Sequence, residues 1–230
     1  MMRSDGRNAN QLRAVTFEVD AQRNALSSVI TRFGNTRVLT AVSVQHKTPA
    51  WRDGNAWITA EYAMLPGSST ERINRDRKGA SGRSTEIERL IGRSLRCAVD
   101  LALLPPVTLT IDCDVIDADG GTRTAAITGA WVALARALTH FEATEALTRQ
   151  IAAVSVGIVD GECVLDLPYA EDVRADTDMN VVMTDAPAFV EVQGTAEGAP
   201  FDRGALATLL DLAAAGIGEL FTLQQAAVNA

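Results

Sequence analysis

The sequence has little histidine and little cysteine, and both shortages restrict its chemistry. Its two histidines, His46 and His140, are too few for a histidine metal cage and offer little to a histidine-dependent nucleophilic triad. The three cysteines lie singly, at spacings that fit neither a disulfide framework nor a zinc site, so we expect them to be small core residues: Cys97, Cys113 and Cys163. Acid–base chemistry must therefore fall to carboxylates.

Overall positive charge is also missing. The formal net charge is −8 and the pI is about 4.8, which argues against nucleic-acid binding through overall basicity. Between residues 72 and 96, however, eight basic side chains stand against three acidic ones. This local excess indicates either a basic patch on an acidic body or a solvated loop followed by a charged helix face.

Long hydrophobic runs are absent as well. No run approaches the roughly 20 apolar residues of a membrane span, and the first residues lack the apolar region of a signal peptide. We therefore expect a cytoplasmic protein with no membrane partner. With 230 residues, of which 47% are hydrophobic and 22% charged, the chain is expected to form one large domain or two closely packed halves.

The hydrophobic pattern predicts strands, then helices, then strands and a final helix. Alternating segments predict β-strands at 13–19, 25–31, 37–44, 57–65 and 107–115, and two later hairpins at 151–167 and 181–193. Helical spacing predicts helices at about 85–102, 124–138 and 203–226, the last interrupted at Gly216 and Gly218. Segment 67–82 is expected to be a long exposed loop. This order favours an α+β fold.

The stretch 117–124, between a predicted strand and a predicted helix, has the composition of an anion-binding turn. Gly120 and Gly121 would let backbone N–H groups approach a ligand closely, and the helix start favours negative charge. Arg123 adds a planar charged group suited to phosphate. An ordinary exposed turn, in which Asp and Gly serve only the turn geometry, explains the same residues.

A second arginine stands at another predicted helix start. Thr85 and Glu88 have capping-box spacing, which places Gly82 and Arg83 just before the first turn. If the fold brings Arg83 and Arg123 together, one phosphate could be held from both sides. The alternative is an arginine that serves only solubility at a helix start.

Acidic residues gather between the two late hairpins. Glu171, Asp172, Asp176 and Asp178 fall within a short segment. Oxygen ligands of this kind suit Mg²⁺ that is shared with substrate phosphates. One carboxylate could instead hold a proton for a leaving group, if its neighbours raise its pKa. An acidic surface loop is the alternative explanation.

Seven motifs in one order closely resemble the bacterial ribonuclease PH family, nearly from end to end. They read RSDGR (3–7), WITAEYAMLP (57–66), GR (82–83) with EIERLIGRSLR (86–96), IDCDV (111–115), ADGGTRT (118–124), DMNVVM (178–183) and VEVQGTAEG (190–198). The resemblance implies an α+β fold like that of domain 2 of ribosomal protein S5. It also implies a single domain over 1–230, with halves at about 1–140 and 150–230, that assembles as a ring-shaped homohexamer, a trimer of dimers.

The resemblance further implies a phosphorolytic 3′-to-5′ exoribonuclease, a reversible nucleotidyltransferase that trims tRNA precursors and other RNA 3′ ends and releases nucleoside diphosphates. By matching positions, the phosphate co-substrate would be bound by Arg83, Gly121, Thr122 and Arg123. The catalytic aspartates, which would also bind Mg²⁺, match Asp172 and Asp178, and we favour Asp178 as proton donor to the departing 3′ oxygen.

The basic loop supplies candidates for RNA binding, namely Arg72, Arg75 and Arg77, which would contact the RNA backbone without reading its sequence. Gly67 stands where the family usually has an arginine. Two other functions compete with this interpretation. One is a non-catalytic RNA-binding ring subunit of the same fold. The other is a nucleotide-binding phosphotransferase, although the chain lacks the Gly-x-x-x-x-Gly-Lys-Ser/Thr loop.

Overall fold

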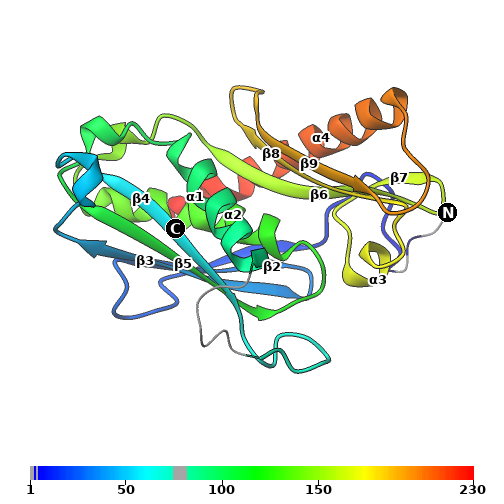
Figure 1. Ribbon diagram of the computed structural model, residues 1–230, viewed down its shortest axis with the longest axis horizontal. Coiled ribbons are helices and arrows are strands. Elements are labelled where there is room, and N and C mark those ends of the chain that lie inside the picture. The colour runs from blue at the N-terminus through cyan, green and yellow to red at the C-terminus, as the bar shows by residue number, and fades with distance from the viewer. Residues whose placement is uncertain (1–2, 4, 75–81) are drawn as a thin grey trace.

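The protein consists of two β-sheets with helices packed against them (Figure 1). The structure is a computed structural model, which describes residue 3 and residues 5–74 and 82–230. The strand order is β1-β2-β3-β5-β4 in the first sheet and β7-β6-β8-β9 in the second. The strands are β1 (Val15–Val19), β2 (Ser27–Phe33), β3 (Thr36–Gln45), β4 (Trp57–Met64), β5 (Thr108–Asp117), β6 (Ile151–Val159), β7 (Glu162–Leu165), β8 (Thr177–Thr184) and β9 (Phe189–Ala196). The helices are α1 (Gly82–Arg96), α2 (Thr122–Thr139), α3 (Tyr169–Asp172) and α4 (Arg203–Val228), with short 3-10 turns at Ala50–Arg52, Leu101–Leu103 and Thr144–Ala146.

The first sheet is antiparallel except where β4 runs parallel to β5. Helix α1 makes the crossover between these two strands, as a parallel pair requires. On β5, Leu109, Ile111 and Cys113 are buried, whereas Asp112 and Asp114 on the other face are only half-buried. The alternation predicted for this segment is therefore confirmed.

Helix α2 packs against β2 and β3 of the first sheet and against β6 of the second. Most of its residues are buried, and many are alanine, so the sheets can approach it closely. At Gly129 a side chain would have no room, because a Cβ there would lie 2.0 Å from Thr31 Oγ1 on β2. One hydrophobic cluster includes residues of both sheets, among them Val42 and Val154.

The second half contains the two predicted hairpins, and both are confirmed. Asp160 and Gly161 connect β6 to β7 with positive φ values of 50° and 79°. These values are those of a tight hairpin turn, for which Asp-Gly is a favoured sequence. Helix α4 covers β6 and β7 and reaches β1 (Figure 1).

The predicted limits of α1 are wrong at both ends. The helix begins at Gly82, so Thr85 lies inside it and the predicted capping box does not start it. The Glu88 carboxylate instead accepts a hydrogen bond from the backbone N–H of Tyr62, at 3.4 Å. The helix ends at Arg96 rather than near residue 102, because Val99 pairs with Leu147 in a β-bridge.

Two further expectations fail. Helix α4 is continuous through Gly216 and Gly218. Gly216 permits close packing instead, since a Cβ there would lie 2.8 Å from Leu165 Cδ1. Cys97 is exposed, and only Cys113 of the three cysteines is fully buried.

Helix α4 also contradicts the expectation that no apolar run is long enough to span a membrane. By length and composition alone it could cross a membrane, and 28% of its most apolar stretch is buried. A single helix of this kind is weak evidence for a span, since helices that pack on a soluble core meet the same criteria.

Candidate active site

The connection from β5 to α2 is a glycine turn, residues 118–121. Gly120 and Gly121 have φ values of 73° and 65°, in the left-handed region that glycine adopts at little cost. At Gly120 a side chain is also excluded sterically, because a Cβ would lie 2.5 Å from the carbonyl oxygen of Leu167. Gly121 caps α2, whose first amide groups have no acceptor within the helix. The turn therefore presents N–H groups and the positive end of a helix dipole.

This turn lines a cavity of about 870 Å³ that lies between the two halves. The cavity is also lined by the end of β4, residues 69–74, the start of α1, and residues of α3 and β8. The predicted site residues that line it are Arg72, Arg83, Gly121, Thr122, Arg123, Asp172 and Asp178. Residues that are far apart in the sequence thus meet in one place.

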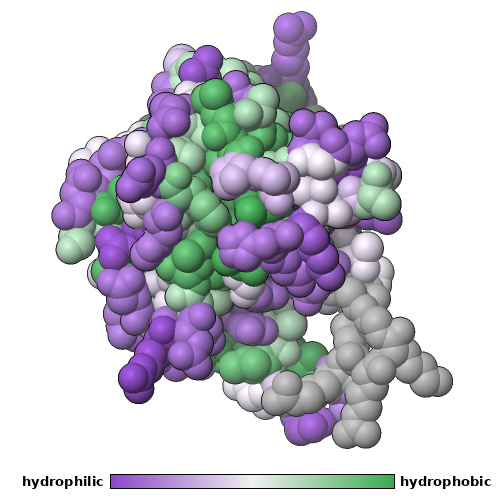
Figure 2. All heavy atoms as spheres, turned by 90° about the vertical axis from the view of Figure 1, so that its left-hand side faces the viewer, coloured by the Kyte–Doolittle hydropathy of each residue, from purple (hydrophilic) through white to green (hydrophobic). Residues whose placement is uncertain are grey.

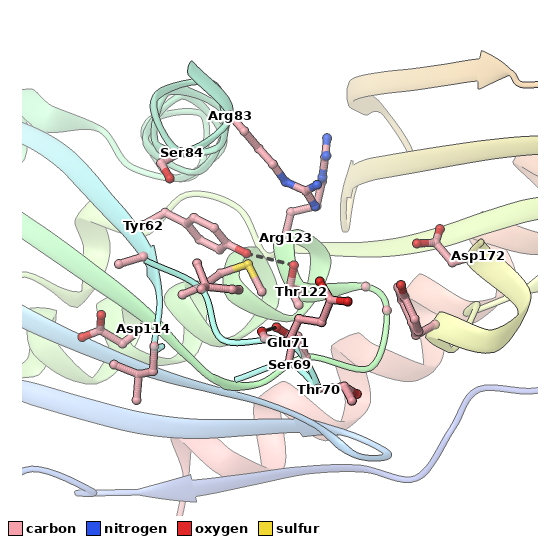
Figure 3. A pocket seen from close by; sticks show the side chains of 18 of the residues that line it. Tyr62, Ser69, Thr70, Glu71, Arg83, Ser84, Asp114, Thr122, Arg123 and Asp172 are labelled. Atoms are coloured by element: carbon pink, nitrogen blue, oxygen red, sulfur yellow. Dashed lines mark hydrogen bonds between the residues drawn. The ribbon is translucent and has the colours of Figure 1, made fainter. Parts of the chain in front are cut away.

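Arg83 and Arg123 point into the same part of this cavity, from the first turns of α1 and α2 (Figure 3). The Nη1 atom of Arg123 donates a hydrogen bond to Gln193 Oε1 at 2.7 Å and lies 3.6 Å from Glu86 Oε1. Gln193 in turn donates to Glu86 at 2.6 Å. Gln193 on β9 therefore orients Arg123, a role that the sequence analysis did not assign although the residue lies in a quoted motif.

Asp172 and Asp178 face the two arginines from the second half of the chain. Burial raises the pKa of Asp172, while the charges of Arg83 and Arg123 partly oppose the shift. The pKa of Asp178 is raised further, to about 6, by burial and then by the negative charge of Asp172. A carboxyl group with such a pKa can carry a proton close to neutral pH.

These two aspartates are also the residues that could hold a metal ion. Both side chains line the same cavity. Among the residues that the structure describes, no group of three or more His, Cys, Asp or Glu side chains could form a metal cage. Two carboxylates fit Mg²⁺, which keeps several waters and binds substrate phosphates in place of a full set of protein ligands.

Tyr62 is a site residue that the sequence analysis missed. Its side chain on β4 is buried, and its hydroxyl group donates a hydrogen bond to Thr122 Oγ1 at 2.9 Å (Figure 3). Burial raises the pKa of this hydroxyl group. The tyrosine lies in the motif at residues 57–66, but alternation alone indicates only that it faces inward, not that it meets the start of α2.

Of the three arginines predicted to bind RNA, only Arg72 can be placed. It is exposed at the rim of the cavity, where its Nη1 atom donates to Asn74 Oδ1 at 3.0 Å. Arg75 and Arg77 lie outside the described residues.

Two models of one protein family match most of the chain. The model of domain 1 of the 3′ exoribonuclease family matches residues 11–139, and the model of domain 2 matches residues 149–216. Ribonuclease PH of Frankia casuarinae is 53% identical over 233 residues, which cover 100% of this chain and 94% of that protein. Ribonuclease PH of Saccharopolyspora erythraea is 53% identical over 240 residues, with coverage of 100% and 96%.

Solved structures share the fold. Rice Rrp46 has a TM-score of 0.81 and 20% identity, over 98% of this chain and 100% of that one. A chain of the Archaeoglobus fulgidus exosome with RNA bound to the active site has a TM-score of 0.81 and 22% identity, over 96% and 91%. At these identities the likeness concerns the fold alone, and it confirms the predicted α+β class.

Proposed function

The chain belongs to the 3′ exoribonuclease family, and we propose that it is a phosphate-dependent 3′-to-5′ exoribonuclease of the ribonuclease PH type. The observation that carries the proposal is the meeting of Arg83, Arg123 and the start of α2 with two carboxylates in one cavity. Attack of a phosphate on a phosphodiester concentrates negative charge, and such a site is built to stabilise it.

In this mechanism the attacking inorganic phosphate is bound between Arg83 and Arg123, with Gly121 and Thr122 donating from the start of α2. An oxygen of this phosphate attacks the phosphorus of the last phosphodiester of the RNA. The bond from that phosphorus to the 3′ oxygen breaks, which releases a nucleoside diphosphate and leaves a shortened RNA. Because the new bond resembles the one broken, the reaction runs in both directions, as expected of a nucleotidyltransferase.

The departing 3′ oxygen needs a proton, and we assign its donation to Asp178. The pKa of this carboxyl group, raised to about 6, keeps part of the population protonated near neutral pH. Asp172 supports this state, since its negative charge raises the pKa of Asp178.

Mg²⁺ is the cofactor that this site would take, held by Asp172 and Asp178, where Asp178 would contact the ion through one of its waters while it carries the proton. When bound, the ion would neutralise charge on the phosphate oxygens. Arg83 and Arg123, which point into the same cavity, would also neutralise charge on the phosphate oxygens (Figure 3).

The RNA substrate would be a single-stranded 3′ end, such as the tail of a tRNA precursor, that reaches the cavity past Arg72. Arg72, together with Arg75 and Arg77, would contact RNA phosphates, which gives affinity without sequence choice. Such RNA is cytoplasmic, and we place the enzyme in the same compartment.

We further propose that the chain forms one domain and assembles as a homohexameric ring. In support of one domain, a single hydrophobic cluster includes residues of both sheets.

In support of assembly, apolar residues form a band across one end of the molecule (Figure 2). Large apolar side chains such as Leu103 and Val192 are exposed on the described surface. A contiguous exposed apolar patch on a protein surface is typical of a site of protein–protein contact.

The test is to incubate a tRNA with an extended 3′ tail with and without inorganic phosphate, and to identify the released nucleotides. We expect shortening only with phosphate, and nucleoside diphosphates as products. The Asp178→Asn variant, purified in the same way, controls for contaminating nucleases. Nucleoside monophosphates would mean hydrolysis and would overturn the mechanism, and RNA binding without shortening would favour a non-catalytic ring subunit.

A further inference from the structure

Arg13, just before β1, joins the glycine turn to the second half of the protein. Its Nη1 atom donates a hydrogen bond to the carbonyl oxygen of Asp119 at 2.5 Å, and its Nη2 atom donates to that of Gly120 at 3.4 Å. The same guanidinium group forms a two-point ion pair with Asp166, with distances of 3.0 Å from Nε and 2.7 Å from Nη2. Both side chains are buried.

These contacts fix the direction of the amide groups of the turn. In a trans peptide unit, the C=O of one residue and the N–H of the next point in opposite directions. The carbonyl oxygen of Gly120 also accepts a hydrogen bond from Thr36 Oγ1, at 2.7 Å. With the carbonyls of Asp119 and Gly120 held on the side of Arg13 and Thr36, the N–H groups of Gly120 and Gly121 point away from that side. Both glycines line the cavity.

Asp166 is itself held firmly in place. Its carboxylate also accepts a hydrogen bond from the backbone N–H of Arg13 at 2.8 Å. Its carbonyl oxygen accepts from Arg3 Nη2 at 2.9 Å and from Arg7 Nη2 at 3.0 Å. Its φ of 55° lies in the left-handed region, which aspartate and asparagine tolerate better than most residues. Asp166 is therefore a fixed point from which Arg13 reaches the turn.

We propose that Arg13 and Asp166 are positioning residues that set the affinity of the glycine turn for the attacking phosphate. Neither residue touches the phosphate in this proposal. Arg13 acts through the peptide units of residues 119–121, and Asp166 acts by holding Arg13. The inference rests on the proposed function, because it takes inorganic phosphate as the anion that the turn binds.

A purely structural ion pair would behave differently in kinetics. If the pair only stabilised the fold, its loss would lower the melting temperature and the amount of active enzyme, with the KM for phosphate unchanged. If it positions the amide groups, its loss raises the KM for phosphate in enzyme that is still folded, and leaves the KM for RNA unchanged. The split between the two KM values therefore separates the two roles.

The test uses Asp166→Asn and Arg13→Lys in the full chain. Asparagine tolerates the same backbone conformation and can still accept the backbone hydrogen bond of Arg13, and lysine keeps the charge but cannot bind the turn and Asp166 together. Arg136→Lys is the matched control, since Arg136 pairs with Asp20 at 2.9 Å, and neither of these two residues lines the cavity. Initial rates are measured against phosphate and against RNA, with the melting temperature of each variant.

We expect both test variants to raise the KM for phosphate by about tenfold or more, as the loss of a charged hydrogen bond would. The KM for RNA should stay within about twofold, and the control should match the wild type in both. An unchanged KM for phosphate in folded variants would overturn the inference, and failure of both variants to fold would assign the pair to stability alone. Absence of phosphate-dependent shortening by the wild type would instead refute the proposed function.

Discussion

Asp178→Asn is expected to stabilise the metal-free protein at neutral pH while it abolishes activity. Burial and the charge of Asp172 raise the pKa of Asp178 from 3.8 to about 6, so its ionised form is unfavourable in the folded state. The difference of about two pKa units corresponds to roughly 3 kcal/mol of unfolding free energy. The stability linked to this proton is fully present below about pH 4 and is lost as the pH rises through about 6. An amide of the same shape has no charge to bury, so it avoids the loss.

The assay is urea denaturation of wild type and variant in phosphate-free buffer with a chelator, at several pH values from about 4.5 to 8. The unfolding free energy of the variant should exceed that of the wild type most above pH 6, and this difference should shrink toward the acid end of the range. Asp211→Asn, at an exposed position on α4, is the control and should show no such pH-dependent gain. Adding Mg²⁺ should stabilise the wild type more than the Asp178 variant. A variant that is no more stable than wild type at pH 8, or a gain that does not change with pH, would refute the reasoning.

Three other predictions concern the phosphate site, the packing at two glycines and the reactivity of two cysteines. Arg123→Ala should raise the KM for phosphate by about 100-fold, because it removes a charged donor from the proposed phosphate site; rates measured over a range of phosphate concentrations check this, and an unchanged phosphate dependence would remove Arg123 from the site. Gly129→Ala should lower the unfolding free energy by about 1–3 kcal/mol, because a Cβ there has no room. Gly218→Ala, at a position with no neighbour within 4 Å, should raise the unfolding free energy by about 0.5–1 kcal/mol. Denaturation curves that failed to separate the two variants would contradict the packing described for α2. With a thiol reagent, exposed Cys97 should react in the native protein, and Cys113, whose pKa burial raises to about 12, should react only after unfolding.

Much of the fold was predictable because its signals are local. Alternation identified β5, and the Asp-Gly pair at 160–161 identified the hairpin of β6 and β7. The wrong predictions also came from local signals in the sequence. The capping-box spacing at Thr85 also occurs by chance inside a helix, and Gly216 suggests a break when only the sequence is read, although it serves contact with Leu165.

The site was predictable in part for a related reason. The glycine turn, Arg83, Arg123 and the aspartates carry side chains or conformations whose chemistry is evident from residue type, and the structure brings them into one cavity. Arg13 and Tyr62 carry no such signal. Arg13 meets Asp166 across 153 positions of sequence, and Tyr62 meets Thr122 across 60, and no pattern within one segment reports contacts at such separations.

The central claim is that inorganic phosphate is the attacking group. It is tested most directly by supplying phosphate labelled at phosphorus and locating the label in the nucleotides released from an RNA 3′ end. The account predicts one labelled phosphorus in each released nucleoside diphosphate, at the terminal position. Unlabelled nucleoside monophosphates, released at the same rate with or without phosphate, would contradict it.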